Sequence, residues 1–462
     1  MSKATTTELN LSQPSWKQSA SPQEVWFKQS QQLDLFWFVG PDDTVARVIE
    51  RAFELKAQTE EAKLVNNSGK FYRYKKDFGF YEHLRKAEIN KEVSNMLPYV
   101  QTKPLGKDKE GNYKYERKAS SPRNVKDSVE WLRHRVNSSS MDIVNAIAFR
   151  NGTYLLDNNS FGPHSPDYFL TYCIEGDYLQ DADCPPAFSN FIKSSFGEEW
   201  IPIIRKVIRY LIDPTFPPAK FIGIIGDSGS GKGVLERLIE NMFPPSCISS
   251  ISKFKQIDSP EKCHQLVKGK RLIAFPDLQG FQTGVGTLYA LSDGGSLSSR
   301  PLFADDTEAE SFNGRVIFCS TQAPCVENAG SGMGRRQLIL RTKPCMGRTP
   351  DFCLDQKLKE ELGGIVSWSL GIDREEVLSM LAGSDELMNE AALEAEVDMD
   401  PVRGFIDHCL MPAQSVDFLP DKRELYQHYK KFCHDYGYNK PCTQQTLISR
   451  LKQALPHLVT GR

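Results

Sequence analysis

The sequence lacks long apolar runs, closely spaced cysteines and internal repeats. No uninterrupted apolar stretch reaches the roughly 18 residues that a membrane-spanning helix needs, and the amino terminus has no apolar core of the kind found in secretory signals. The cysteines number 11, an odd count, and none has C-x-x-C spacing, which argues against a disulfide framework and against a zinc site. No repeat of about 20–50 residues is visible. We therefore expect no membrane span, and reduced thiols in a cytoplasm.

The chain also lacks a strong net charge. Its 57 Lys and Arg residues and 59 Asp and Glu residues leave a formal charge of −2, so a polyanionic partner would have to bind a local patch. One stretch is basic, because Lys70–Arg135 contains 17 basic and 9 acidic residues. The aromatic residues interleaved with it are Phe71, Tyr72, Tyr74, Phe78, Phe80, Tyr81, Tyr113 and Tyr115. This mixture indicates either a nucleic-acid surface or a β-meander with an aromatic core face and a solvated basic face, and we favour the meander.

The length of 462 residues exceeds what one hydrophobic core normally fills. Composition and patterning divide the chain into a solvated tail (1–30), a locally basic α+β domain (31–140), a region of strands and helices (141–214), an α/β domain (215–380), a helical linker (381–400) and a last helical unit (401–462). Asn151-Gly152 is typical of a tight turn between strands. The apolar spacing from Trp200 to Leu211 predicts one buried helical face.

The most informative segment is Phe221–Phe243, FIGIIGDSGSGKGVLERLIENMF. A short apolar strand leads into G-x-x-x-x-G-K, and an amphipathic helix follows at once, which is the context that a phosphate loop requires. Glycines let backbone N–H groups converge on the phosphates of ATP, and Lys232 follows the γ-phosphate during transfer. The predicted nucleotide-binding residues are Gly226, Asp227, Ser228, Gly229, Ser230, Gly231, Lys232, Gly233 and Val234. Gly233 departs from the motif, because a Ser or Thr usually binds Mg²⁺ at this position.

Two further predicted strands have polar residues at their carboxyl ends. Leu272–Phe275 is followed by Asp277, a carboxylate that can hold Mg²⁺ and orient the attacking water. Val316–Cys319 is followed by Ser320, Thr321 and Gln322. Gln322 is predicted to sense the γ-phosphate from between the two other strands, and with Lys232 and Asp277 it belongs to the predicted catalytic set.

Two arginines and a turn signal complete this set of motifs. Arg335 and Arg336 stand just before another predicted strand, where a guanidinium is suited to reach the triphosphate of a neighbouring subunit as an arginine finger. The turn signal Asp293-Gly294-Gly295-Ser296 is flanked by alternating apolar and polar residues, which predicts a hairpin. Arg300 follows in this hairpin. In a ring of subunits, such a hairpin contacts DNA in the channel.

The order of these motifs resembles that of superfamily 3 helicases, and more closely that of the phage and plasmid primase-helicase group. Asn151-Gly152, His164-Ser165-Pro166 and Cys184-Pro185 are similar to landmarks upstream of the group's helicase domain, and the segment from Pro401 is similar to its winged-helix unit. The resemblance implies an α/β fold: an AAA+-like P-loop ATPase core with a parallel sheet, after a small α+β domain and before a winged-helix-like domain.

The same resemblance implies a ring, expected to be a homo-hexamer, that uses ATP and Mg²⁺ and translocates on DNA. The expected partners are single-stranded and forked DNA and a separate primase, in the cytoplasm of a bacterial or phage-infected cell. The sequence departs from the family pattern in several places: Gly233 replaces the metal hydroxyl, Gln322 stands where Asn is usual, and Ser296 stands where an acid is common. The hairpin also lacks the Lys that often contacts DNA.

The last unit is predicted to present a helix to DNA. Lys422–Tyr436 has the pattern of a helix closed by Gly437, and Thr443 can cap a second helix whose Leu447 and Leu451 face inward. The outward residues predicted to bind DNA include Gln444, Gln445, Arg450 and Lys452. An ordinary polar face on a small helical domain is the alternative.

Together these features predict an ATP-dependent DNA helicase or translocase that serves replication of a phage, plasmid or other mobile element. Two alternatives stay open. A P-loop kinase of a small molecule would need an acceptor pocket and would work without DNA. A replication initiator or adaptor would bind ATP without hydrolysing it, and the missing metal hydroxyl at Gly233 is compatible with that behaviour.

Overall fold

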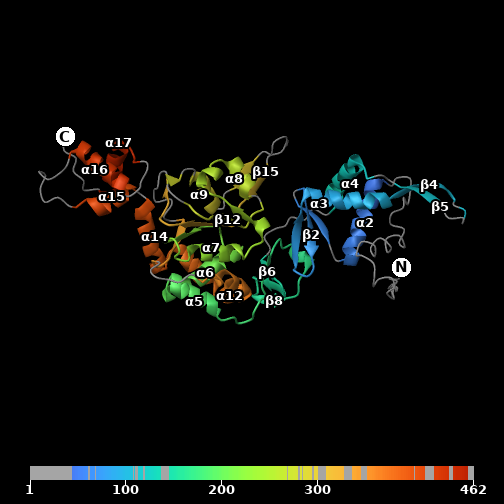
Figure 1. Cartoon of the computed structure of the whole chain (residues 1–462), viewed down its shortest axis with the longest axis horizontal. Helices are drawn as coiled ribbons and strands as arrows, with labels where there is room; N and C mark the ends of the chain where they lie inside the picture. The colour runs from blue at the N-terminus through green and yellow to red at the C-terminus, as the bar shows by residue number, and fades with distance from the viewer. Residues whose placement is uncertain are drawn as a thin grey trace, which may run out of the picture. The chain divides into compact units, whose positions relative to one another are not determined.

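A computed structural model describes residues 44–455 except 61–62, 68, 108, 110–112, 118–119, 137–144, 268, 279–280, 283–284, 294–295, 300–307, 327–335, 345–350, 400, 412–420 and 436–440. The chain forms two compact units, one of residues 1–142 with 164–171 and the other of residues 143–163 with 172–462 (Figure 1). Within the described residues, no helix is long and apolar enough to cross a membrane. The predicted tail, 1–30, lies outside the described part of the chain.

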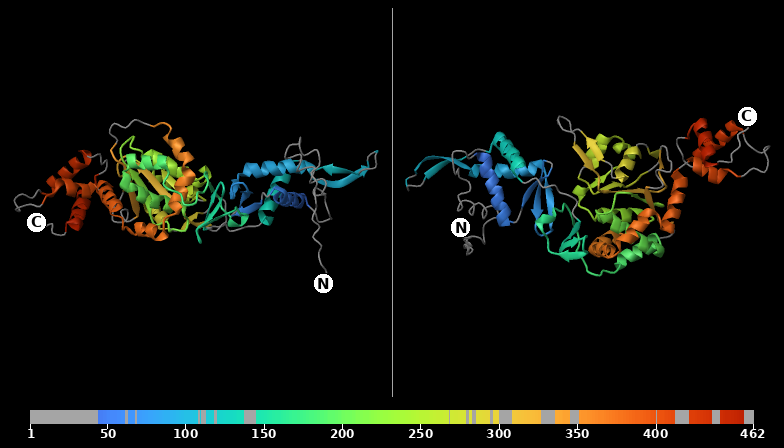
Figure 2. Two further views of the ribbon diagram at one scale, coloured as in Figure 1. Left: turned by 90° about the horizontal axis from the view of Figure 1, so that it is seen from below. Right: turned by 180° about the vertical axis from the view of Figure 1, so that it is seen from behind.

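Helices and two small sheets make up the first unit. The helices are α2 (Val45–Glu60), α3 (Lys86–Met96), η2 (Leu97–Tyr99) and α4 (Pro122–Arg135), and β4 (Gln101–Lys107) pairs with β5 (Tyr113–Arg117). Val48, Val93 and Leu132 bring α2, α3 and α4 into one core. The two views in Figure 2 show these helices as the blue to teal ribbons.

An antiparallel meander forms the other sheet of this unit, in the order β1 (Leu64–Asn67), β2 (Lys70–Lys75) and β3 (Phe80–Leu84). The aromatic side chains that it buries are Phe71, Tyr74 and Tyr81. Phe78, in the turn between β2 and β3, is 45 % exposed. The predicted meander with an aromatic core face is therefore confirmed for these three strands, with Phe78 as an exception.

The second unit begins with a four-stranded sheet in the order β8-β7-β6-β9. Its strands are β6 (Ala146–Phe149), β7 (Gly152–Leu155), β8 (Ser160–Gly162) and β9 (Cys173–Ile174). Residues 164–171 between the last two strands, which contain η3 (Pro166–Tyr168), belong to the first unit. Asn151-Gly152 forms the predicted turn between β6 and β7. Helices α5 (Pro186–Ser195), η4 (Glu198–Trp200) and α6 (Ile201–Ile212) follow. The predicted apolar face from Trp200 to Leu211 is buried, because its members belong to the main core.

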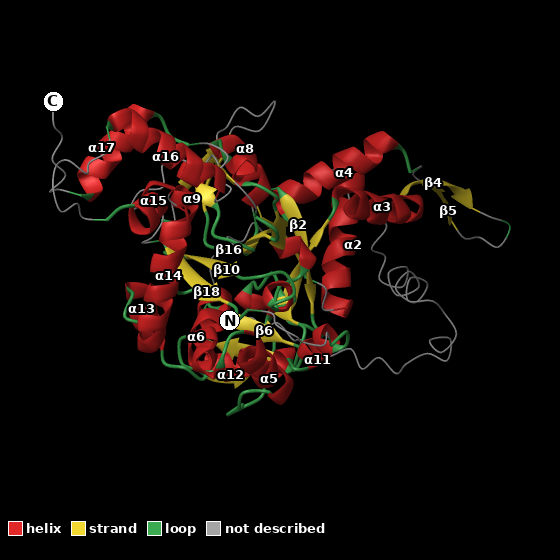
Figure 3. Ribbon diagram, turned by 60° about the vertical axis from the view of Figure 1, so that its left-hand side comes forward, coloured by secondary structure: helices red, strands yellow, loops and turns green. Residues whose placement is uncertain are grey.

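A five-stranded parallel sheet lies at the centre of this unit, in the order β11-β12-β16-β10-β18. The strands are β10 (Phe221–Ile225), β11 (Ile248–Ser250), β12 (Leu272–Phe275), β16 (Arg315–Ser320) and β18 (Gln337–Arg341). Every residue of β10, β12 and β16 is buried, as expected for parallel strands with both faces covered. Figure 3 shows β16, β10 and β18 side by side in yellow. An α/β fold with a parallel sheet is therefore confirmed.

Helices and short strands surround this sheet. They are α7 (Lys232–Glu240), η5 (Pro245–Cys247), η6 (Phe254–Ile257), α8 (Pro260–Val267), α9 (Val285–Ser292), α11 (Leu354–Glu360), α12 (Leu362–Leu370) and α13 (Arg374–Ala382), with the paired strands β13 (Phe281–Gln282) and β17 (Cys325–Val326). The helix α7 packs against β10 and β16, whereas α12 and α13 pack against α6.

The carboxyl-terminal region is helical. The predicted linker 381–400 contains α14 (Glu386–Met399), which packs on β18 and places Met388, Ala391 and Ala395 in the main core. Helices α15 (Pro401–Cys409), α16 (Lys422–Asp435) and α17 (Gln444–Ala454) share a separate small core. Thr443 caps α17 as predicted, since its side chain accepts a hydrogen bond from the Thr446 N–H at 3.3 Å. Gly437 lies outside the described residues.

Candidate functional site

The predicted phosphate loop lies between β10 and α7. Gly229 and Gly231 adopt positive φ angles of 77° and 105°, which glycine adopts without the steric cost that a Cβ brings. Gly231 immediately precedes the first turn of α7, so the unpaired N–H groups of that turn lie next to the loop. A loop of this kind followed by a helix amino terminus is suited to bind an anion. Asp227, Ser228 and Gly229 are exposed.

Lys232 begins α7 and turns back over the loop. Its Nζ donates a hydrogen bond to the Asp227 carbonyl at 3.1 Å, so the ammonium lies beside the backbone that would surround a phosphate. Ser230 is fully buried, and the Thr342 hydroxyl after β18 is hydrogen-bonded to its Oγ at 2.7 Å. The loop is therefore fastened to the end of the neighbouring strand.

The ends of three strands are joined by backbone hydrogen bonds. The Gly226 N–H donates to the Ser320 carbonyl at 3.2 Å, and the Leu278 N–H donates to the Cys319 carbonyl at 2.8 Å. The start of the loop and the residue after Asp277 are thus both bound to the end of β16. Asp277 is exposed. As predicted, the strand that precedes Gln322 lies between the two others.

The residues after β16 divide into a buried anchor and an exposed pair. Ser320 is buried, and its Oγ donates to the Leu278 carbonyl at 2.5 Å and also contacts the Gln322 carbonyl. These bonds fix the turn that carries Thr321 and Gln322, whose side chains are exposed. Gln322 is therefore displayed at the same sheet edge as Asp277 and the loop, and its role as a sensor stays a prediction.

Glu236 is a polar residue of this region that the sequence analysis missed. It lies on α7, one helical turn after Lys232, is only 5 % exposed, and its Oε1 has no hydrogen-bond partner among the described residues. Burial raises the pKa of Glu236 to about 7, and the negative charges of Glu240 and Asp277 act in the same direction. The sequence did contain a signal for this burial. Glu236 stands between Leu235 and Leu238, and this helical spacing places it on the buried face of α7.

Burial also raises the pKa of the Cys319 thiol, and the carboxyl of Glu236, which is hydrogen-bonded to it, adds to the increase. A neutral thiol and an acid with a raised pKa thus lie together beneath the loop. Neither is exposed, so we assign both to the support of the site rather than to contact with a ligand.

Gly233 leaves room where the usual hydroxyl would stand. A Cβ built at this position would have Arg237 Nη1 at 3.3 Å as its one close neighbour. Arg237 in turn is paired with Asp355 of α11 at 3.0 Å. No hydroxyl among the described residues takes the place of the side chain that Gly233 lacks. Val234, the next residue, is half-buried.

The second arginine of the predicted finger is held within its own chain. Arg336 is 11 % exposed, donates to both carboxylate oxygens of Asp293 at 2.8 and 2.6 Å, and lies over the Tyr289 ring at 4.9 Å. A guanidinium held in this way is poorly placed to extend to another subunit, so the structure disfavours Arg336 as the finger. Arg335 lies outside the described residues, and its role stays a prediction.

The predicted hairpin exists, but its turn is not where the glycines are. Asp293 directly follows α9, and strand β14 (Ser296–Ser299) pairs antiparallel with β15 (Glu308–Ser311). Asp293 therefore follows a helix, and Ser296 is already the first residue of a hairpin strand. Arg300 falls in the segment 300–307 between the strands, outside the described residues.

The predicted DNA-facing residues lie on α17. Gln445 and Lys452 are exposed, Arg450 is half-buried, and Gln444 donates a hydrogen bond to the Lys422 carbonyl at 2.9 Å. Leu447 and Leu451 face the small core, as predicted. Gln444 therefore joins α17 to the start of α16, whereas the others remain a predicted surface for DNA.

Two family descriptions match the chain. Residues 46–197 match the family described as D5 N terminal like, and residues 397–460 match the family described as Poxvirus D5 protein-like. Together these two matches support a protein of the phage or viral primase-helicase type. They confirm the resemblance to the primase-helicase group.

Solved structures with similarity to this chain include apo forms of the NrS-1 C terminal region. The A form is 10 % identical with a TM-score of 0.43, over 87 % of this chain and 94 % of that chain. The A form of residues 305–718 is 11 % identical with a TM-score of 0.44, over 87 % of this chain and 92 % of that chain.

Proposed function

We propose that this chain is an ATP-dependent DNA helicase or translocase that acts in replication of a phage, plasmid or other mobile element. The observation that carries the proposal is the junction at β16, where the phosphate-loop motif and the residue after Asp277 are bonded to neighbouring carbonyls of one strand. A nucleotide seated on the loop would thus lie at the sheet edge that also displays Asp277 and Gln322. This arrangement supports an AAA+-like core of the superfamily 3 type.

The side chains at this edge fit ATP with Mg²⁺. The loop amides and Lys232 would bind the phosphates. Mg²⁺ usually takes one or two carboxylates together with phosphates and waters, which suits a single exposed Asp277. Within the described residues, no three His, Cys, Asp or Glu side chains gather as a metal cluster, so the phosphates and waters would supply the other ligands. The metal would stabilise charge on the phosphates, and Asp277 would orient the attacking water.

Hydrolysis at the interface of a ring, expected to be a hexamer, would need a cation from the next subunit. Since Arg336 is bound to Asp293, we assign this role to Arg335. Gln322 would sense the γ-phosphate and transmit its loss through the turn that Ser320 anchors. DNA would contact the hairpin through Arg300 and the carboxyl-terminal unit through Gln445, Arg450 and Lys452.

Lys232→Ala tests the proposal. Loss of the cation that follows the γ-phosphate should lower DNA-stimulated ATP hydrolysis at least about 100-fold and abolish strand displacement on forked DNA. Lys262→Ala is the matched control, because Lys262 is exposed on α8 and pairs only with the nearby Asp258 at 3.0 Å among the described residues. Retention of hydrolysis by the Lys232→Ala protein would refute the assignment.

One alternative has an observation in its favour. Gly233 lacks the hydroxyl that usually binds the metal, and Arg336 is bound within its own chain. Both features are compatible with an initiator or adaptor that binds ATP without hydrolysing it. Such a protein should assemble when ATP is added but show negligible turnover. Measuring particle size and phosphate release in the same samples, with and without single-stranded DNA, separates the two functions.

A further inference from the structure

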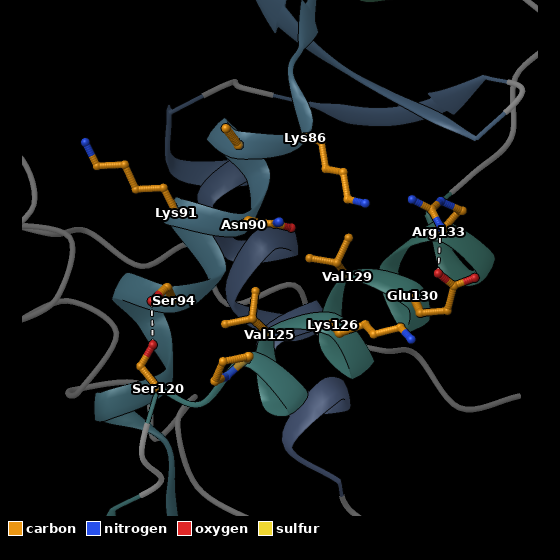
Figure 4. Close-up of a pocket in the computed structure, with 12 residues that line it drawn as sticks. Lys86, Asn90, Lys91, Ser94, Ser120, Val125, Lys126, Val129, Glu130 and Arg133 are labelled. Carbon is orange, nitrogen blue, oxygen red and sulfur yellow. Dashed lines mark hydrogen bonds and ion pairs between the residues drawn. The ribbon is translucent and has the colours of Figure 1, made fainter.

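A groove separates the helices α3 and α4 in the first unit, far in sequence from the phosphate loop. Its volume is about 810 Å³. The side chains that line it come from α3, from α4 and from the residues just before α4 (Figure 4). The groove lies within one compact unit, so its shape depends on the packing of α3 against α4 and on their shared core.

Positive charge dominates this groove. Lys86, Lys91, Lys126 and Arg133 line it, against a single carboxylate, Glu130. Arg133 is paired with Glu130 at 2.6 Å, which neutralises that carboxylate. The three lysines make no ion pair with another residue in the described part of the chain. Figure 4 shows Lys86 and Lys91 extending from α3 and Lys126 from α4.

The other acids of these helices are directed elsewhere. Glu92 binds Lys56 and Arg73 at 2.6 and 2.5 Å, on the side of α3 that packs towards α2 and β2. Glu88 is paired with Arg85 at 2.7 Å, and Asp127 with Arg123 at 3.7 Å. The positive charge of the groove is therefore left uncompensated by its own helices, and an anion would gain from entering it.

Between the cations, the groove offers apolar surface and small polar groups. Ala87, Pro122, Val125 and Val129 supply the apolar part. Asn90, Ser94 and Ser120 supply hydrogen-bonding groups, and the two serine hydroxyls are hydrogen-bonded to each other. A ligand that suits this surface has repeated negative charges with less polar groups between them.

We propose that the groove between α3 and α4 binds the backbone of single-stranded nucleic acid. Phosphates would pair with Lys86, Lys91 and Lys126, while a base would lie on the apolar surface of Ala87, Pro122 and Val125. A single strand exposes the faces of its bases for such contact, whereas stacking in a duplex covers them. A lysine-rich surface binds phosphates without regard to sequence, so the contact would serve any strand.

This contact adds to the proposed function and does not depend on ATP. A strand that is also bound at the groove would be held by the first unit while the ATPase core acts on it. Because the phosphate loop takes no part, binding is measured without nucleotide. Failure of the groove and failure of the proposed helicase activity are then distinguishable.

The test uses the whole chain and a short fluorescent oligothymidine. Lys91→Gln combined with Lys126→Gln removes two exposed cations and keeps side chains that helices tolerate well. If each lysine neutralises one phosphate, the slope of log K against log salt should fall by about 1.4, which is about a 25-fold loss of affinity at 0.1 M salt. The control combines Lys75→Gln with Arg123→Gln, two cations of the same unit outside the groove, whose side chains are 43 % and 90 % exposed and are paired with Glu82 and Asp127.

Equal affinity and equal salt slope in the groove variant and the wild type would overturn the proposal, as would an equal loss in the control. Competition with unlabelled polymers identifies the partner. Oligothymidine should displace the probe well, and duplex DNA and polyglutamate poorly. Displacement by duplex or by polyglutamate as strong as that by oligothymidine would refute a single-strand site and would indicate a general polyanion or acidic-peptide surface instead.

Discussion

The edge of the five-stranded sheet and the groove between α3 and α4 are both assigned to phosphates, but they present their polar groups differently. At the sheet edge, backbone bonds from Gly226 and Leu278 and the bond between Thr342 and Ser230 fix the position of each group. In the groove, three exposed lysines extend from two helices and make no ion pair with another described residue.

This difference has consequences for what each surface can recognise. Fixed backbone N–H donors suit one triphosphate in one geometry. Binding is lost when an added side-chain atom moves these donors. Long cationic side chains suit a polymer whose phosphates vary in position, and they fail when salt screens them. We therefore expect steric changes to affect the first surface and charge changes to affect the second.

The largest expected effect tests the steric sensitivity of the sheet edge. In Gly226→Ala, the new Cβ would lie 1.6 Å from Thr342 Oγ1 and 3.1 Å from Ser230 Oγ, so the loop would have to move away from β18. ATP affinity and turnover should fall about 100-fold or more. Gly286→Ala in α9 is the matched control, because a Cβ there meets no atom within 4 Å. Equal nucleotide affinity in both variants, measured by titration with a fluorescent ATP analogue, would contradict a fixed loop.

The features of this edge that the sequence predicted are local or follow from strand topology. The strand Phe221–Ile225, the glycines of the loop and the helix from Lys232 are adjacent in sequence, so their pattern carries the signal. Asp277 and Gln322 were placed together because parallel strands end at one edge. The roles of these residues stay predictions, although their positions match the expected edge.

The features that the sequence did not predict depend on distant partners. The pairing of Arg336 with Asp293 spans 43 residues, and no local pattern signals it. α14 has the acidic composition of a solvated helix, yet Met388 and Ala395 pack into the core beside β18. Likewise, the basic surplus of the first unit was visible, but which lysines share one groove depends on how α3 and α4 pack.

A smaller effect concerns the buried carboxyl of Glu236 near the sheet edge, whose ionisation is unfavourable in the folded state. The exposed lysines of the groove carry no such cost. The pKa of Glu236 is raised from 4.5 to about 7, so the folded state holds its proton over a window in which the unfolded state has released it. The contribution of Glu236 to stability is therefore greatest below about pH 4.5 and falls as the pH rises to about 7, by about 3 kcal/mol in total. Glu236→Gln, a neutral substitute, should remove this loss.

Urea denaturation at about pH 5 and about pH 8 measures the effect. The variant should match the wild type at the lower pH and exceed it at the higher pH. Lys126→Gln is the comparison from the groove, and as a change at an exposed residue it should alter the free energy of unfolding by less than about 0.5 kcal/mol at either pH. Parallel pH profiles for wild type and Glu236→Gln would show that the buried carboxyl carries no such cost.

The smallest expected effect comes from adding a side chain at Gly233, where the loop at the sheet edge has space for one. A Cβ at Gly233 meets only the flexible end of Arg237, at 3.3 Å, so Gly233→Ser should fold and supply the hydroxyl that phosphate loops usually direct at Mg²⁺. The Mg²⁺ concentration for half-maximal ATP hydrolysis should fall a few-fold. Gly233→Ala adds the same Cβ without the hydroxyl and should leave the Mg²⁺ requirement as it is. If both variants shift it equally, the added carbon rather than a metal ligand is responsible, and Asp277 with water and phosphate is sufficient for the metal.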